Sequence, residues 1–120
     1  MTAMATPADP EFRARLAALN DKFAATVPAT LEKIGQAFAE CKAGGDLPPD
    51  AALHRLHELL HGVAGSAGTF GFGMLGQQAR RIEQMLRVVL AEHSGWPAVI
   101  PEVEQFLRWA AKDPRSTAYE

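Results

Sequence analysis

The residues best suited to chemistry in this chain are two histidines that lie four positions apart. The segment His57-Glu58-Leu59-Leu60-His61 matches the pattern HExxH, in which two His side chains on one helix face bind zinc and the Glu serves as general base. In the alternative interpretation only His61 reacts, and the glycines that follow it clear a surface on which a partner can reach its imidazole. The sequence favours this second interpretation.

The glycines after His61 are the reason for this preference. A glycine inside a helix costs about 1 kcal/mol relative to alanine, so Gly62, Gly65 and Gly68 indicate that something must approach this helix closely. Helical side chains lean toward the N-terminus, and a large side chain at position 65 would therefore cover the imidazole of His61. We expect glycine at this position to leave the ring open.

A longer pattern extends from His61 to Glu83. It reads HGVAGSAGTFG from His61 to Gly71, and it continues with Leu75, Ala79, Ile82 and Glu83. A His with a Gly four residues later, then small residues, a GTFG turn and a helix of the form L-x-x-x-A-x-x-L-E resembles the signature of histidine-containing phosphotransfer (HPt) domains. The resemblance covers this segment together with the helical regions around it.

The resemblance implies a specific role for each of these residues. His61 would accept a phosphoryl group on Nε2 from the aspartyl phosphate of a receiver domain and pass it to another receiver, while Glu83 would hold Nδ1 and so fix the tautomer. Ala64, Gly65 and Gly68 would give the docking partner clearance. The implied partners are a response-regulator receiver domain, a hybrid histidine kinase, or both.

The same resemblance implies that the domain needs help with the chemistry. The sequence has no Gly-rich nucleotide loop of the Walker type and no obvious acidic metal cluster, so we expect neither kinase activity nor a cofactor or metal in this chain. The Mg²⁺ and the acidic pocket would belong to the receiver.

One position departs from the family pattern. HPt domains commonly have a Lys three residues after the phosphorylated His, and this chain has Ala64 there. Arg80 and Arg87 lie three residues before and four residues after Glu83, on roughly its face of the helix, and are candidates to compensate the phosphate charge. Ordinary solvent-exposed arginines are the alternative interpretation.

Two other functions remain open at this point. A helical adaptor could resemble an HPt domain and bind a receiver or kinase without being phosphorylated, and the missing Lys fits that idea. A zinc hydrolase is the remote alternative, with Glu58 as base and Glu83 or His54 as third ligand. Against it, the longer metzincin pattern needs a Gly and a third His where this chain has Ala64 and Ala67. In the favoured interpretation His54 and His57 are solvent-exposed helix residues.

Composition limits the remaining possibilities. A chain of 120 residues with 48% hydrophobic residues suits one globular domain, and a net charge of -2 gives no general attraction for nucleic acid or an anionic membrane. The single Cys41 excludes an internal disulfide and is expected in the core. We see no signal peptide and no membrane span, so we expect a cytoplasmic monomer.

The apolar spacing predicts helices throughout the chain. Residues 1–8 are expected to be a flexible leader, residues 9–112 an HPt-like helical bundle, and residues 113–120 a frayed C-terminal tail. Asp9-Pro10-Glu11 should begin the first helix, Pro28 should end or kink it, and Pro101 should begin the last helix. The inward stripes are expected to be Phe12, Leu16, Leu19 and Phe23; Leu31, Ile34, Phe38 and Cys41; Leu53, Leu56, Leu60, Val63, Ala67 and Phe70; Leu75, Ala79, Ile82, Leu86 and Val89; and Val103, Phe106, Leu107 and Ala110. The predicted fold is all-α: an antiparallel four-helix bundle with an additional N-terminal helix.

Overall fold

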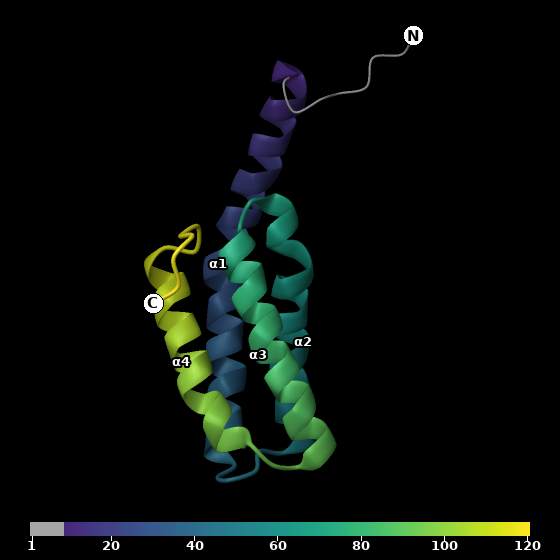
Figure 1. Ribbon diagram of the computed structural model, residues 1–120, viewed down its shortest axis with the longest axis vertical. Helices are drawn as coiled ribbons and strands as arrows, with labels where there is room; N and C mark the ends of the chain where they lie inside the picture. The colour runs from purple at the N-terminus through teal and green to yellow at the C-terminus, as the bar shows by residue number, and fades with distance from the viewer. Residues whose placement is uncertain (1–8) are drawn as a thin grey trace.

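The computed structural model describes residues 9–120, and its regular structure is entirely helical (Figure 1). This confirms the predicted all-α class. The expected flexible leader, residues 1–8, lies outside the described residues. The elements are α1 (Pro10–Ala43), α2 (Asp50–Ser66), the 3₁₀ turn η1 (Gly68–Phe70), α3 (Gly73–Glu92) and α4 (Trp96–Lys112).

The four helices form an antiparallel bundle in which successive helices run in opposite directions (Figure 1). Short connections force this arrangement, because a chain leaving one helix has only a few residues in which to enter the next. The core is aliphatic and aromatic, and it contains Cys41. None of the helices in the described part of the chain is both long and apolar enough to cross a membrane.

Helix α1 begins as the sequence predicts. The side chain of Asp9 accepts hydrogen bonds from the backbone N–H groups of Glu11 at 2.8 Å and Phe12 at 3.3 Å, and Pro10 occupies the first turn. Pro28, however, lies inside the helix, and the chain stays helical on both sides of it. The additional N-terminal helix and the first bundle helix are therefore one continuous helix. A proline removes one backbone hydrogen bond, but the packed half of α1 after it keeps the helix in place.

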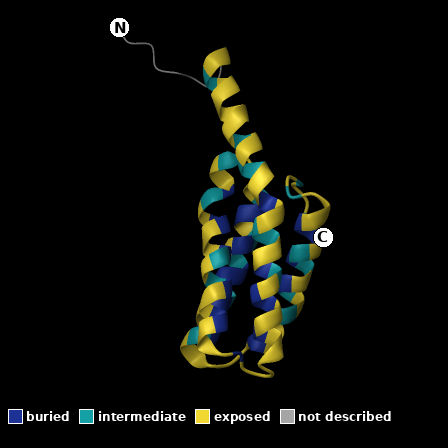
Figure 2. Ribbon diagram, turned by 180° about the vertical axis from the view of Figure 1, so that it is seen from behind, coloured by how far each residue is buried: buried dark blue, intermediate teal, exposed yellow. Residues whose placement is uncertain are grey.

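The N-terminal half of α1 extends beyond the other helices. Helix α1 has 34 residues, whereas α2 and α4 have 17 each, and Figure 2 shows the protruding end exposed almost along its whole length. Phe12 is only partly buried, and Leu16 and Leu19 are 37% and 49% exposed, so their predicted place in the core is wrong. Periodicity identified the apolar face correctly, but no helix lies opposite it. Phe23 is the first residue of this face that packs against the core, where its ring contacts Phe70 and Phe72, and Val27 is the first that is fully buried.

Helix α2 ends earlier than the apolar spacing suggested. It stops at Ser66, and η1 follows, so that Gly68 and Phe70 lie in a 3₁₀ turn and Phe70 is only half-buried. Gly71 has a φ of 88°, a left-handed conformation that glycine adopts without strain, and it reverses the chain into α3. The backbone N–H of Phe72 then donates to the carbonyl of Ala67 at 2.8 Å, which closes the junction.

A second glycine brings α3 close to this junction. A Cβ atom on Gly76 would lie 3.3 Å from the backbone nitrogen of Gly68 and 3.4 Å from the Cβ of Ala67. No larger residue fits there without movement of the backbone of η1 or of α3. Gly76 therefore allows α3 to pack closely against the end of α2.

The last helix and the tail both differ from expectation. Helix α4 begins at Trp96, with a proline in its first turn, and Pro101 lies inside it. Residues 113–120 are not frayed but fold back. The indole N–H of Trp109 donates to the carbonyl of Ala118 at 2.7 Å, and the ring of Tyr119 packs edge-on against the indole. The buried indole gives the tail a partner that spacing alone could not reveal.

Candidate functional site

The central contact of the site joins His61 on α2 to Glu83 on α3. Nδ1 of His61 lies 2.5 Å from Oε2 of Glu83, and the carboxylate is buried, with only 3% of its side chain exposed. The imidazole, in contrast, is 64% exposed. A carboxylate can only accept a hydrogen bond, so Nδ1–H donates and Nε2 carries the lone pair. Nε2 has no hydrogen-bond partner within residues 9–120 and is open to an incoming group.

The charges around Glu83 keep it ionised. Burial raises the pKa of this carboxyl, but the hydrogen bond from His61 and the positive charges of His61, Arg87 and His57 outweigh burial and lower it overall. A buried carboxylate that stays ionised can stabilise positive charge on the imidazole it holds. This contact is the one that the sequence resemblance implied.

His57 lies one turn before His61 and belongs to the same cluster. Its Nε2 lies 3.5 Å from Oε2 of Glu83, and the two imidazoles are nearly parallel, with ring centroids 6.1 Å apart. Only 18% of the side chain of His57 is exposed, so the expectation of a solvated residue is wrong. The reason is that position 57 faces α3, where the side chain of Arg87 covers the ring. The Nε–H of Arg87 donates to Nε2 of His57 at 3.4 Å.

The two candidate arginines lie on either side of Glu83 along α3. Nη2 of Arg87 is 3.5 Å from Oε2 of Glu83, one helical turn away. Arg80 reaches across to α2, where its guanidinium donates to the carbonyl oxygen of Ala64 at 3.3 Å. Both side chains are solvent-exposed, but each contacts the site: Arg80 at the backbone of α2 and Arg87 at Glu83.

The three residues predicted to give clearance behave differently. A Cβ atom on Gly65 or on Gly68 would meet no atom within 4 Å, so both positions border open space. Ala64, however, is only 8% exposed and packs in the core, so its side chain offers little surface to a partner. Position 64 lies on the inward face of α2, three residues after His61, and only its carbonyl oxygen participates in the site.

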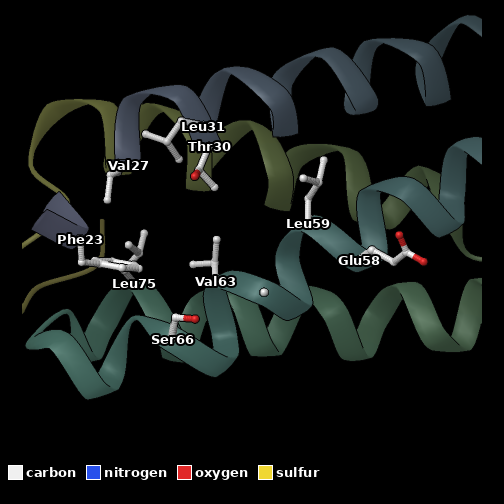
Figure 3. Close-up of a pocket in the computed structure, with 10 residues that line it drawn as sticks. Phe23, Val27, Thr30, Leu31, Glu58, Leu59, Val63, Ser66 and Leu75 are labelled. Carbon is white, nitrogen blue, oxygen red and sulfur yellow. The ribbon is translucent and has the colours of Figure 1, made fainter. Parts of the chain in front are cut away.

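An open apolar groove lies between α1 and α2 (Figure 3). It has a volume of about 270 Å³, and its lining includes Phe23 and Leu31 of α1 and Glu58, Leu59 and Ser66 of α2. Glu58, the general base required by the zinc alternative, thus borders this groove with α1, whereas His57 and His61 contact Glu83 of α3. Within residues 9–120, no group of three or more His, Cys, Asp or Glu side chains is arranged to hold a metal ion.

Sequence reasoning missed the roles of Gly76, His57 and the Arg87 contact to His57. One signal was present: Gly76, Arg80, Glu83 and Arg87 are spaced by four, three and four residues, which places them on one face of α3. That face lies against the His-bearing face of α2.

Comparison with known proteins gives one match. The family model described as Hpt domain matches residues 18–111. No curated protein and no solved structure matches significantly.

Proposed function

The chain belongs to the Hpt domain family, and from this premise we propose that His61 carries a phosphoryl group between receiver domains in a two-component phosphorelay. The observation that supports this most directly is the pairing of an exposed imidazole with a buried carboxylate through Nδ1. That pairing leaves the nucleophilic nitrogen, Nε2, directed away from Glu83.

The proposed transfer begins with an aspartyl phosphate on a receiver. Nε2 of His61 attacks phosphorus, the new N–P bond forms, the bond from phosphorus to the aspartyl oxygen breaks, and the receiver's carboxylate departs with the electron pair. Because Nδ1 keeps its proton, the ring gains positive charge as the bond forms. The carboxylate of Glu83, 2.5 Å from Nδ1, stabilises that charge. The reverse reaction transfers the phosphoryl group from Nε2 to the aspartate of the next receiver.

The added phosphate charge needs cations, and the family's usual Lys is replaced by Ala64. Arg80 already contacts the carbonyl oxygen of this residue, so its guanidinium lies within one helical turn of His61. Arg87 lies on the opposite side, against Glu83. We assign charge compensation to these two arginines, and the Mg²⁺ that assists the chemistry to the receiver.

The docking surface is built around the exposed imidazole. Gly65 and Gly68 border open space, so no side chain at these two positions obstructs the approach of a receiver's acidic pocket to Nε2. The guanidinium groups of Arg80 and Arg87 favour an acidic partner.

Phosphorylation of His61 is tested directly with the whole chain. The protein is incubated with a phosphorylated receiver, or with phosphoramidate, which phosphorylates histidine without a partner. We expect one acid-labile, base-stable label per chain, and no label on His61→Gln. The matched control is His54→Gln, an exposed His on the same helix, which should be labelled normally.

Two results would contradict this function. A receiver that binds stably while His61 stays unlabelled would support the adaptor alternative. Stoichiometric zinc uptake that depends on both His57 and His61 would support the hydrolase alternative.

A further inference from the structure

Three groups approach one oxygen of the buried carboxylate. Oε2 of Glu83 lies 2.5 Å from Nδ1 of His61, 3.5 Å from Nε2 of His57 and 3.5 Å from Nη2 of Arg87. In addition, Nε–H of Arg87 donates to Nε2 of His57 at 3.4 Å. Nε2 of His57 cannot accept a hydrogen bond from Arg87 and donate one to Glu83 at the same time. The cluster therefore has two mutually exclusive arrangements, which differ in whether Nε2 of His57 carries a proton.

The unphosphorylated protein favours neutral His57. Burial lowers the pKa of this imidazole, the negative charge of Glu83 opposes that effect, and the positive charges of Arg87 on α3 and of His61 and His54 on α2 lower the pKa further. Neutral His57 with its proton on Nδ1 accepts the hydrogen bond from Arg87 at Nε2, and this contact keeps the guanidinium beside Glu83.

Phosphorylation reverses the electrostatic balance. A phosphoryl group brings up to two negative charges to Nε2 of His61, whose ring centroid lies 6.1 Å from that of His57. Negative charge on this neighbouring ring favours the protonated form of the His57 imidazole. Once protonated, His57 donates through Nε2 to Glu83 and no longer accepts from Arg87, so the guanidinium is free to turn toward the phosphoryl group.

We propose that His57 is a positioning residue that takes up a proton from solvent when His61 is phosphorylated, replaces Arg87 at Glu83 and releases the guanidinium to the phosphoryl group. This inference rests on the proposed phosphorylation of His61. The guanidinium of Arg87 would then be available to the phosphoryl group only after phosphorylation. The family pattern instead has a Lys at the position of Ala64, where the cation is always present. Proton uptake by His57 also makes the lifetime of phosphohistidine depend on the protonation of a second residue.

The test is an NMR titration of the whole protein with labelled histidines, before and after phosphorylation with phosphoramidate. The His57 resonances are assigned by comparison with His57→Gln. We expect the titration midpoint of His57 to move upward by about one pH unit on phosphorylation. The Nε–H signal of Arg87 should move at the same time. A midpoint that stays unchanged or falls, in protein shown to be phosphorylated on His61, overturns the inference and leaves the proposed function intact. Absence of any phosphohistidine at position 61 overturns both.

A functional measurement separates proton uptake from a merely structural role. His57→Gln keeps an acceptor for Arg87 but cannot gain a proton. We expect the hydrolysis rate of its phosphohistidine to change less steeply with pH than that of the wild type between about 5 and 7, where imidazoles titrate. The wild type and His93→Gln, which replaces an exposed His just after the end of α3, should retain the full dependence. Thermal unfolding of each variant verifies that the fold is unchanged, and equal pH profiles for His57→Gln and the wild type would refute the positioning role.

Discussion

The carboxylate of Glu83 offers the most direct quantitative test of the site. Nδ1 of His61 gains positive character only as the N–P bond forms, so the contact to a buried, ionised acceptor stabilises the transition state more than the ground state. A hydrogen bond to a charged group contributes about 1.5–3 kcal/mol, and one between neutral groups about 1 kcal/mol.

Two substitutions of Glu83 separate the effect of its negative charge from the effect of the hydrogen bond itself. Glu83→Gln keeps a neutral acceptor at nearly the same place and should lose about 1–2 kcal/mol, which corresponds to about 5- to 30-fold in rate. Glu83→Ala removes the acceptor altogether and should lose about 2–3 kcal/mol, or about 30- to 150-fold. Binding of a receiver should change little in either variant, because the side chain is buried beneath the imidazole.

The rates are measured in single-turnover experiments. Quenched samples give the rate of His61 labelling by a phosphorylated receiver and, separately, by phosphoramidate, which removes docking from the measurement. Gln84→Ala, an exposed neighbour on α3, is the matched control. If both Glu83 variants transferred within twofold of the wild type while remaining folded, the orienting role of this carboxylate would be refuted.

Three further predictions concern other parts of the chain. Gly65→Leu should slow labelling by a receiver at least tenfold without loss of stability, since a Cβ there meets no atom within 4 Å and a helical Gly costs about 1 kcal/mol. Gly35→Leu on α1 is its control, and equal transfer rates in the two would contradict the clearance argument. Arg80→Gln should shorten the lifetime of phosphorylated His61 severalfold, more at low salt than at high salt, and a lifetime insensitive to both would return Arg80 to an ordinary surface contact. The thiol of Cys41, whose pKa is raised to about 11 by burial and by the nearby Glu40, should react with a thiol reagent only after unfolding, which rapid modification of the native protein would disprove.

Some features of the site were predictable from sequence because they follow from spacing along one helix. The exposure of His61 and the open space at Gly65 depend on which side of α2 each residue occupies, and helical periodicity gives that directly. The contact to Glu83 was implied by family resemblance and is present in the structure. The roles of these residues in phosphotransfer remain predictions.

Other features depend on what lies opposite a face, and spacing does not contain that information. Leu16 and Leu19 continue the apolar stripe of α1 but extend past the ends of the shorter helices, so they are exposed. Ala64 is buried because its side of α2 turns inward. His57 is partly covered because Arg87 of another helix lies over it. Each of these outcomes is decided by a neighbour distant in sequence.

The close packing at Gly76 has a consequence for the carboxylate two turns farther along α3. Gly76 and Glu83 lie on the same face, so a larger residue at position 76 that pushed α3 away from η1 would also displace the carboxylate. A carboxylate about 6 Å from the helix axis moves by about 2 Å if α3 turns by about 20°, which would break the 2.5 Å contact to His61. The absence of a side chain at Gly76 thus helps to maintain the position of α3 relative to α2. Inactive variants selected at random should include replacements at this position, although it touches neither the imidazole nor the phosphate.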